Sequence, residues 1–296
     1  MILITGAAGK TGKAILRKLA DQTGTVKALV FRSAQIAEVK ALGAREVIVG
    51  DMRDAVLIQR AMQGVQSVYH ICPNVHPDEI TIGKGIIDAA ASAGITQFVY
   101  HSVLYPQIEE MPHHWKKMRV EEHLFASGLP FTILQPAVYM QNILVNWEQI
   151  IETGRYTIPY AVESRISMVD LEDVALAAAI VLREAVLEGS RSPHNGATYE
   201  LAGTHPMSQS EVAAILSQEF GRAVVAESVS IDVWKNKVRT SGLDDYWVNT
   251  LEKMFAYYAK HGLSGNSQVL GWLLNRPPTS FEAFVKRAVQ DRLHVA

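Results

Sequence analysis

The chain has 296 residues, of which 48% are hydrophobic and 20% charged, and its formal net charge is −2. This composition is typical of a globular protein, and the length suits one large domain or two closely packed ones. Because Lys and Arg are scattered along the chain, we expect no direct binding of nucleic acid.

The first two-thirds of the chain alternate between strand-like and helix-like segments. Short apolar runs predict strands at 2–5, 26–31, 45–50, 67–72, 97–102 and 131–136. Helical patterns lie between several of them, at 10–22, 55–64 and 81–94. Glycines predict helix ends in the left-handed conformation at Gly24, Gly43, Gly64, Gly94 and Gly128. This alternation predicts an α/β fold, a doubly wound parallel sheet with helices on both faces.

Beyond Pro136 the alternation becomes less regular. The patterns predict a helix at 141–153, a strand at 155–160, a connection and helix within 166–182 and a strand at 197–203. From Ser208 onward helices dominate, at 208–221, 244–262 and 280–290. We expect one domain from 1–136 plus about 165–203, and a smaller, mainly helical C-terminal lobe from about 137–164 plus 204–296.

Three glycines separate the first predicted strand from the first helix, in ITGAAGKTG (4–12). Gly6 permits a tight turn, Gly9 the close approach of a phosphate, and Gly12 close packing of helix on strand. The N–H groups and the dipole at the helix start favour a pyrophosphate. A plain strand-to-helix turn is the alternative, but the position within a βαβ unit favours nucleotide binding.

The second and third strands end in residues that suit the rest of a dinucleotide. An NAD-specific site carries Asp or Glu after the second strand, whereas this strand ends in Arg32 and Ser33. A guanidinium pairs with a 2′-phosphate, so NADPH is favoured over NADH; a solvated surface arginine is the alternative. Asp51 ends the third strand, placed to cap the next helix or, with Met52, to border the adenine.

The fourth and fifth strands end in Cys72-Pro73 and His101-Ser102, at the carboxyl edge where ligands bind in such sheets. Cys72 is more typical of buried packing than of a nucleophile. As the single cysteine, it forms no intramolecular disulfide, which favours a reducing compartment. The opening MILITG is typical of a strand rather than a signal peptide, and the apolar runs are short for a membrane span, so we expect a cytoplasmic protein.

Several stretches together resemble the NmrA-like branch of the atypical short-chain dehydrogenases/reductases, over nearly the whole chain. They are ITGAAGKTG, VFRS, VGDMRD, RVEEHLFASGLPFTILQPAVYMQN (119–142) and LNRPPTSFEAFV (274–285). The resemblance implies a Rossmann domain with a small substrate-covering lobe. It also implies relatives of two kinds: NADPH-dependent quinone, dye and isoflavone-type reductases, and redox-sensing regulators that bind the dinucleotide without turnover.

The resemblance also directs attention to a lysine. The Tyr-x-x-x-Lys pair of ordinary short-chain dehydrogenases is absent from the sequence. Some relatives place one lysine shortly before the helix that contains VEE, which corresponds to Lys117, or to Lys116 if the register slips. Such a lysine would bind the nicotinamide ribose and supply a proton. Two lysines on a solvated helix start are the alternative.

Further candidates surround this lysine. Ser102 holds the position where dehydrogenases carry a substrate-facing hydroxyl, and Tyr139 follows Pro136 on a segment expected to enter the pocket. We expect His113 and His114 on a surface loop; an imidazole that shuttles protons is the alternative. No metal-ligand spacing is present in the sequence, so no metal is predicted. The aromatic residues of the lobe are expected mostly in its core, with a few lining an apolar pocket: Trp234, Trp247, Phe255, Tyr257, Tyr258 and Trp272.

The sequence therefore predicts an NADPH-dependent oxidoreductase that passes hydride to a small apolar acceptor, such as a quinone, an aromatic carbonyl or an activated alkene. The alternative is a non-catalytic NADP(H) sensor that acts through a protein partner. A homo-oligomer is left open. The expected catalytic residues are Lys117, Ser102 and Tyr139. The expected cofactor-binding residues are Gly6, Ala8, Gly9, Lys10, Thr11, Gly12, Arg32, Ser33, Asp51, Met52, Cys72, Pro73, Ser102, Lys117 and Pro136.

Overall fold

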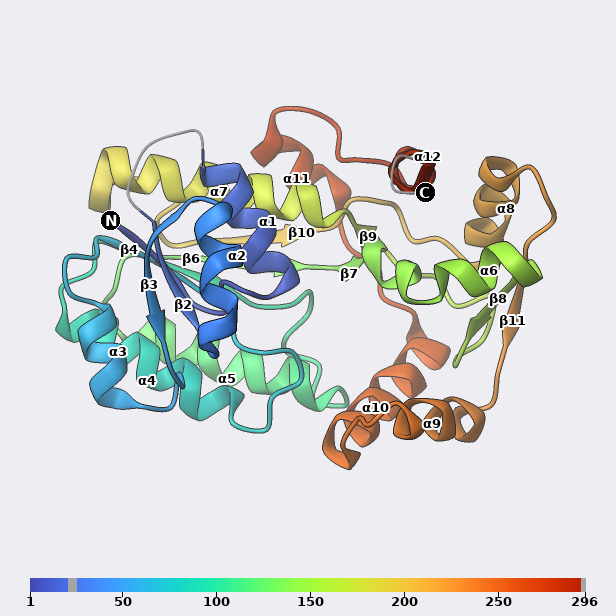
Figure 1. Ribbon diagram of the computed structural model, residues 1–296, viewed down its shortest axis with the longest axis horizontal. Helices are drawn as coiled ribbons and strands as arrows, with labels where there is room; N and C mark the ends of the chain where they lie inside the picture. The colour runs from blue at the N-terminus through green and yellow to red at the C-terminus, as the bar shows by residue number, and fades with distance from the viewer. Residues whose placement is uncertain (21–25, 294–296) are drawn as a thin grey trace. The chain divides into compact units, whose positions relative to one another are not determined.

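The computed structural model describes residues 1–20 and 26–293, and its chain divides into two compact units (Figure 1). The first unit comprises Met1–Ile108, His113–Gln135 and Val174–Tyr199. The second unit comprises Glu109–Pro112, Pro136–Asp173 and Glu200–Ala296.

The first unit is built on a seven-stranded sheet with the order β10-β6-β5-β4-β1-β2-β3. Its strands are β1 (Ile2–Ile4), β2 (Val26–Val30), β3 (Ala44–Val49), β4 (Ser67–His70), β5 (Gln97–His101), β6 (Phe131–Pro136) and β10 (Ala197–Leu201). The pairings from β3 through to β6 are parallel. The order reverses at β1, so the crevice at the carboxyl ends of β1 and β4 is the ligand-binding position of this fold.

Helices cover both faces of this sheet, as the alternating pattern predicts. In Figure 1, α1 (Lys10–Leu19), α2 (Ile36–Ala41) and α7 (Leu171–Glu188) lie on one face. The other face carries α3 (Ala55–Ala61), α4 (Glu79–Ser92) and α5 (Pro112–Ala126). Short 3-10 turns complete the unit at η1 (Ser33–Gln35) and η3 (Gly189–Arg191). The doubly wound α/β fold is confirmed.

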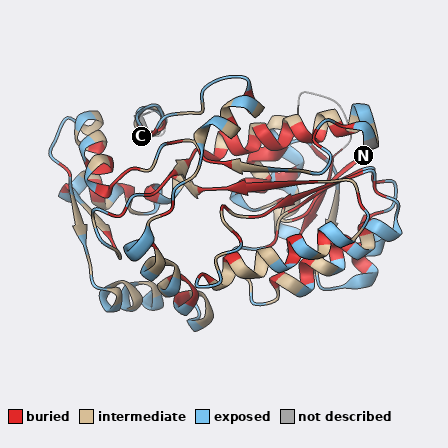
Figure 2. Ribbon diagram, turned by 180° about the vertical axis from the view of Figure 1, so that it is seen from behind, coloured by how far each residue is buried: buried red, intermediate tan, exposed pale blue. Residues whose placement is uncertain are grey.

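The core explains why the strands read as continuous apolar runs. Leu3, Val68 and Phe98 of the sheet are fully buried and form one cluster with residues of α3, α4 and α5. Figure 2 shows most strands of the sheet buried along their length, whereas the helices expose their outer faces. Burying each large apolar side chain contributes about 1.5–3 kcal/mol, which holds the strand ends in place.

The second unit is mainly helical. Its elements are β7 (Val138–Tyr139), η2 (Met140–Asn146), α6 (Trp147–Thr153), β8 (Arg155–Ile158), β9 (Met168–Val169), α8 (Gln209–Phe220), β11 (Val225–Ser228), α9 (Ile231–Thr240), α10 (Asp245–His261), α11 (Ser267–Leu274) and α12 (Phe281–Leu293). Two small sheets pair β8 with β11 and β7 with β9. A core cluster that includes Trp147, Leu216 and Phe284 joins η2 and α6 to α8 and α12.

Two buried carboxylates, Asp170 and Asp173, bind the C-terminal part of the chain within this unit. Asp170 accepts from Arg287 at 2.6 Å, and its side chain is fully buried. Asp173 accepts from Arg276 at 2.5 Å and from the backbone N–H of Thr279 at 2.6 Å. These bonds join the start of α7 to residues 276–287, which are distant in sequence.

The structure corrects several element boundaries. The helix predicted at 10–22 ends at Leu19, and its last predicted residues, with Gly24, lie outside the described residues. The helix predicted at 141–153 begins as the 3-10 turn η2, because α6 starts only at Trp147. Helices α9 and α11 and strand β11, which are short, were not predicted. Among the predicted glycine helix ends within the described residues, all have positive φ: Gly43, Gly64, Gly94 and Gly128.

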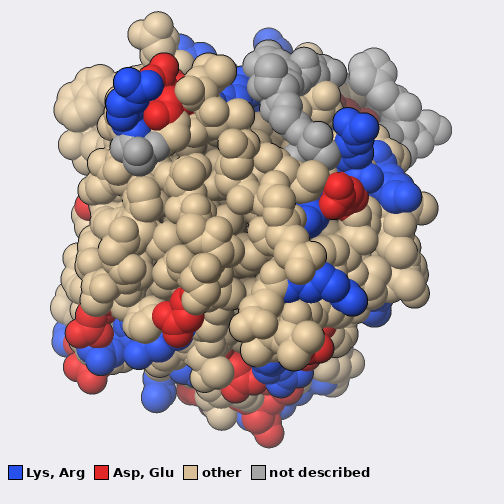
Figure 3. Space-filling model, turned by 90° about the vertical axis from the view of Figure 1, so that its left-hand side faces the viewer, with Lys and Arg blue, Asp and Glu red and all other residues tan. Residues whose placement is uncertain are grey.

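The surface carries charges of both signs. Figure 3 shows one face, on which Lys and Arg side chains lie interspersed with Asp and Glu around an uncharged centre. Within the described residues, no helix is long and apolar enough to cross a membrane.

Candidate functional site

The glycine turn connects β1 to α1 and depends on the absence of side chains. Gly6 has φ of +58°, and a Cβ there would lie 2.8 Å from the carbonyl oxygen of Ile71. A Cβ on Gly12 would lie 2.5 Å from the carbonyl oxygen of Gly6 and 2.7 Å from Ala7 Cα. Gly12 thus allows the helix to pack directly on the turn, as the sequence predicts.

The start of α1 is suited to a phosphate. Gly9 is the N-cap residue, and no side chain caps the helix there. The first turn contains no acidic residue, and Gly9 and Lys10 are exposed. Uncapped N–H groups at an accessible helix start attract an anion, so the residues present fit a pyrophosphate. Ala8 is partly buried beside this position, and Thr11 is buried.

Arg32 and Ser33 are both exposed directly after β2. The backbone N–H of Arg32 donates to Gln35 Oε1 at 2.9 Å, which fixes the start of η1. The position at the end of the second strand matches the one that reads the ribose 2′ substituent in this fold.

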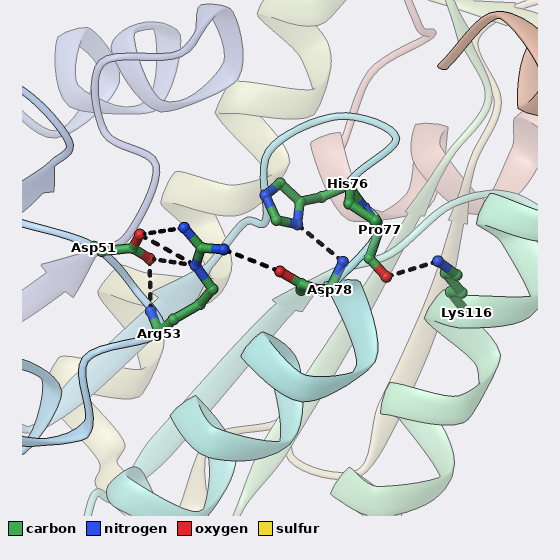
Figure 4. Close-up of polar contacts among 6 residues, drawn as sticks. All are labelled: Asp51, Arg53, His76, Pro77, Asp78 and Lys116. Atoms are coloured by element: carbon green, nitrogen blue, oxygen red, sulfur yellow. Dashed lines mark hydrogen bonds and ion pairs between the residues drawn. The ribbon is translucent and has the colours of Figure 1, made fainter. Parts of the chain in front are cut away.

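Asp51 takes part in an exposed charge cluster after β3, which Figure 4 shows. Its carboxylate accepts from Arg53 Nη2 at 2.6 Å and from the Arg53 backbone N–H at 2.8 Å. These hydrogen bonds lower the pKa of Asp51 to about 2. Arg53 Nη1 also donates to Asp78 at 3.2 Å, so the guanidinium links the loops after β3 and β4. Capping of α3 comes from Asp54 instead, so the capping role considered for Asp51 is wrong.

Lys117 lies near the carboxyl end of β5 in a buried polar network. Its Nζ is 2.9 Å from Glu79 Oε1 and 3.3 Å from the carbonyl oxygen of His101. The side chains of Lys117 and Glu79 are only 14% and 3% exposed. Tyr100 donates to the same carboxylate at 3.0 Å, and Lys117 Nζ lies 5.5 Å from the centre of its ring.

The ion pair determines the charge of this network. Burial alone would raise the pKa of Glu79, but the charge and the hydrogen bond of Lys117 outweigh it, and the net pKa is lowered. Burial also raises the pKa of Tyr100 well above its usual value. An ammonium has three donors, and Glu79 and His101 accept from two of them. Counting contacts with the described residues, one donor of Lys117 therefore remains for a ligand group.

Lys116 and Lys117 lie on different faces of α5, and this decides which of them reaches the carboxyl edge of the sheet. Lys116 donates to the carbonyl oxygen of Pro77 at 2.7 Å (Figure 4), whereas Lys117 binds Glu79. Successive helix residues are rotated by about 100°, so the two lysines cannot share one face. Lys117 is the lysine that lies at the carboxyl edge of the sheet.

Ser102, directly after β5, faces a second buried acid. Its side chain is 2% exposed, and Oγ makes no hydrogen bond to any described residue. The hydroxyl is nevertheless near enough to lower the pKa of Glu121, whose carboxyl is 3% exposed. Gln135 Nε2 donates to both oxygens of Glu121, at 2.9 and 3.2 Å. Burial outweighs these contacts and raises the pKa of Glu121.

Two buried, neutral histidines, His70 and His101, end the strands β4 and β5. Thr5 Oγ1 is 2.9 Å from His70 Nδ1, and Tyr69 Oη is 2.6 Å from His101 Nδ1. Burial lowers the pKa of His70 to about 4 and that of His101 to about 3. Cys72 is buried beside them, and burial raises the pKa of its thiol, which agrees with packing rather than nucleophilic chemistry.

The histidine pair predicted on a surface loop lies in the first turn of α5 instead. His114 is 1% exposed and its Nδ1 is 3.2 Å from the carbonyl oxygen of Tyr105. Burial lowers the pKa of His114 to about 4 and that of His113 to about 2. The expectation was wrong because Pro112 is compatible with the first turn of a helix, which continues without a break through the histidines.

The remaining predicted residues are distributed between the units. Met52 packs against the core cluster, and Pro73 is exposed after β4. Pro136 and Tyr139 belong to the second unit. The lobe's aromatic residues are less buried than expected: Tyr258 is 4% exposed, but Trp272 is 74% exposed. Trp234 and Trp247 stack with ring centres 6.2 Å apart.

Several partners of the predicted site residues were not recognised from the sequence. Glu79 binds Lys117 and Glu121 approaches Ser102, while Gln135 binds Glu121 in turn. A helical signal was available for Glu121 alone, which lies one turn after Lys117 in α5.

The sheet order and the glycine turn define a Rossmann-like α/β protein. Within this class, the chain belongs to the NmrA-like family, whose model matches residues 1–285. The predicted resemblance is thereby confirmed.

Individual relatives are similar over almost the whole chain. The NAD(P)H azoreductase of Xenophilus azovorans is 28% identical, over 97% of this chain and 97% of the relative. Quinone oxidoreductase 2 of Escherichia coli (strain K12) is 28% identical, over 95% and 96%. Among solved structures, an NADPH-dependent quinone oxidoreductase from E. coli complexed with NADPH superposes with a TM-score of 0.84 at 26% identity, over 98% of this chain and all of that one.

Proposed function

We propose that this chain is an NADPH-dependent oxidoreductase that reduces a small apolar acceptor, with quinones, aromatic carbonyls and activated alkenes as the candidate classes. The observation that carries the proposal is Lys117, held at the carboxyl end of β5 with one donor to spare, in the same unit as the glycine turn. The azoreductase and quinone oxidoreductase names of the relatives support the same class of reaction.

The residues divide the work of binding the cofactor. The N–H groups at the start of α1 hold the pyrophosphate, and Arg32 with Ser33 holds the 2′-phosphate. Asp51 and Met52 border the adenine, and Lys117 donates its free N–H to the nicotinamide ribose. The reduced nicotinamide, when bound, supplies a hydride. Ser102 and Tyr139 orient the acceptor.

The proposal also assigns a role to each domain and a cellular compartment to the protein. Residues 1–136 with about 165–203 bind the dinucleotide, while about 137–164 with 204–296 recognise the acceptor. The buried single cysteine suits a reducing, cytoplasmic setting.

A sensor that binds NADP(H) without turnover is the second candidate, and the missing Tyr-x-x-x-Lys pair favours it. The discriminating experiment compares Lys117→Ala with Lys116→Ala as its matched control. For a reductase, Lys117→Ala misplaces the nicotinamide and lowers kcat for quinone reduction by about a hundredfold. The NADPH Kd changes only a few-fold, because the other contacts still hold the cofactor, and Lys116→Ala retains activity. A wild-type protein that binds NADPH but reduces no quinone, azo dye or aromatic carbonyl would support the sensor.

A further inference from the structure

The source of the proton is the open question at this site. Reduction of a quinone requires one proton in addition to the hydride. Lys117 is a poor source, because its ammonium is held by Glu79 at 2.9 Å, and releasing a proton would leave that buried carboxylate unpaired. The donor must lie elsewhere at the carboxyl edge of β5.

The environment of Glu121 favours the protonated form of its carboxyl group. Glu121 is 3% exposed, and both oxygens of its carboxyl receive hydrogen bonds from the uncharged amide of Gln135. The nearest lysine of the same helix, Lys117, forms its ion pair with Glu79 instead. A buried carboxylate without a cation is strongly disfavoured, so the neutral acid is the stable form. Its pKa is raised accordingly.

Ser102 provides the connection from this acid to the ligand edge. Its backbone N–H donates to the carbonyl oxygen of Leu134 at 2.8 Å, which places Ser102 next to Gln135, the residue that binds Glu121. Its Oγ is buried and has no hydrogen-bond partner among the described residues. A buried hydroxyl without a partner carries a free-energy cost of about 1–3 kcal/mol, which a bound acceptor oxygen or nitrogen would relieve. Ser102 also follows β5 directly, at the end of the strand where ligands bind in this fold.

We propose that Glu121 and Ser102 form a proton-delivery pair, in which Glu121 stores a proton and Ser102 passes it to the acceptor. The pair rests on the proposed reductase function. The Ser102 O–H bond breaks as the acceptor oxygen or nitrogen gains that hydrogen, while the Glu121 O–H bond breaks and a new Ser102 O–H bond forms. Together with the hydride of NADPH, this one proton balances reduction of a quinone to a hydroquinone. The Glu121 carboxylate then regains a proton from water after product release.

In this pair Ser102 is the catalytic residue, since it touches the acceptor, and Glu121 is a positioning residue that acts through it. Glu122 supplies the matched control, because it neighbours Glu121 on α5 but is 56% exposed and pairs with Arg119.

The first test measures protonation without cofactor or acceptor. Infrared spectra at pH 7 are expected to show the carbonyl stretch of a protonated carboxyl in the wild type and in Glu122→Gln, and its loss in Glu121→Gln. In wild-type protein labelled with carboxyl-¹³C glutamate, one resonance is expected to remain at the protonated position at pH 7, a readout that needs no variant to fold. Absence of that resonance from the wild type would overturn the proposal.

The second test measures turnover. Glu121→Gln and Ser102→Ala are each expected to lower kcat for quinone reduction by about a hundredfold and to leave the NADPH Kd within about twofold. The double variant is expected to lose little more than either single variant, because the two residues act as one unit. Unchanged kcat in Glu121→Gln, or fully additive losses, would overturn the pair. Failure of wild-type NADPH binding would instead overturn the proposed function, which the carboxyl measurement does not depend on.

Discussion

Adjacent residues at the carboxyl edge of the sheet have opposite environments. Asp78 is 42% exposed and binds Arg53, whereas Glu79, the next residue, is 3% exposed and binds Lys117. Lys116 and Lys117 differ in the same way, since only Lys117 turns into the network. An exposed ion pair is screened by water and contributes little, whereas a buried pair becomes indispensable once formed. The chemistry is therefore expected on the buried side, and the exposed side is expected to tolerate change.

Lowering the pH is expected to have the largest effect on stability, because the buried histidines are held neutral in the folded protein. The pKa values of His70, His101 and His114 are lowered to about 4, 3 and 4, from 6.5 in the unfolded chain. Below pH 6.5 the unfolded chain binds protons that the folded chain does not. The free energy of unfolding therefore decreases as the pH is lowered. Each histidine costs about 2 kcal/mol between pH 7 and pH 5, or about 6 kcal/mol for three.

Urea denaturation at pH 7, 6 and 5 measures this loss. His114→Gln is expected to reduce the loss by about a third, because His70 and His101 keep their contributions. The exposed cluster should survive at pH 5, since the pKa of Asp51 is about 2. Equal stability at pH 7 and pH 5 would contradict the buried, neutral state of these histidines.

Removing one partner of the buried ion pair should be nearly as damaging. Glu79→Ala leaves the Lys117 ammonium without its carboxylate and is expected to lower the free energy of unfolding by about 3–5 kcal/mol. Urea denaturation at pH 7 gives the value. Asp78→Ala is the neighbouring control, and a loss as large as that of Glu79→Ala would show that burial does not separate the two positions.

The glycines of two helices offer a smaller contrast of the same kind. Gly12→Ala would place a Cβ 2.5 Å from a backbone oxygen, and the strain is expected to cost about 1–3 kcal/mol and to weaken NADPH binding. Gly85 lies in α4 with open space around it, so Gly85→Ala should stabilise the protein by up to about 1 kcal/mol. Thermal unfolding with and without NADPH compares them. Equal effects would argue against close packing at the turn.

The exposed cluster is expected to give the smallest effect. Arg53→Gln removes the link between Asp51 and Asp78, but water replaces these contacts. We expect no measurable shift in the urea midpoint and at most a few-fold change in the NADPH Kd. A shift as large as that of Glu79→Ala would mean that the cluster holds the two loops in place.

The sequence predicted what depends on local pattern. The strands of the sheet, the glycine turn and the position of Arg32 follow from apolar runs and from backbone requirements within a few residues. The partners of these residues depend on helix rotation and on contacts between distant segments. Glu79 meets Lys117, and Gln135 meets Glu121, only after β4, β5 and β6 align in the sheet. The histidines were misplaced for a related reason, since polar residues at a helix start resemble a loop.

The central claim is that the glycine turn and Arg32 bind a phosphorylated dinucleotide. Calorimetric titration with NADPH, NADP⁺, NADH and NAD⁺ at one salt concentration tests it most directly, in the wild type and in Arg32→Ala. A charge-assisted contact of about 1.5–3 kcal/mol predicts that the phosphorylated pair binds about 10- to 100-fold more tightly, and that Arg32→Ala loses this preference. Equal affinity for NADH and NADPH would contradict the role of Arg32, and no binding of any of the four would contradict the account as a whole.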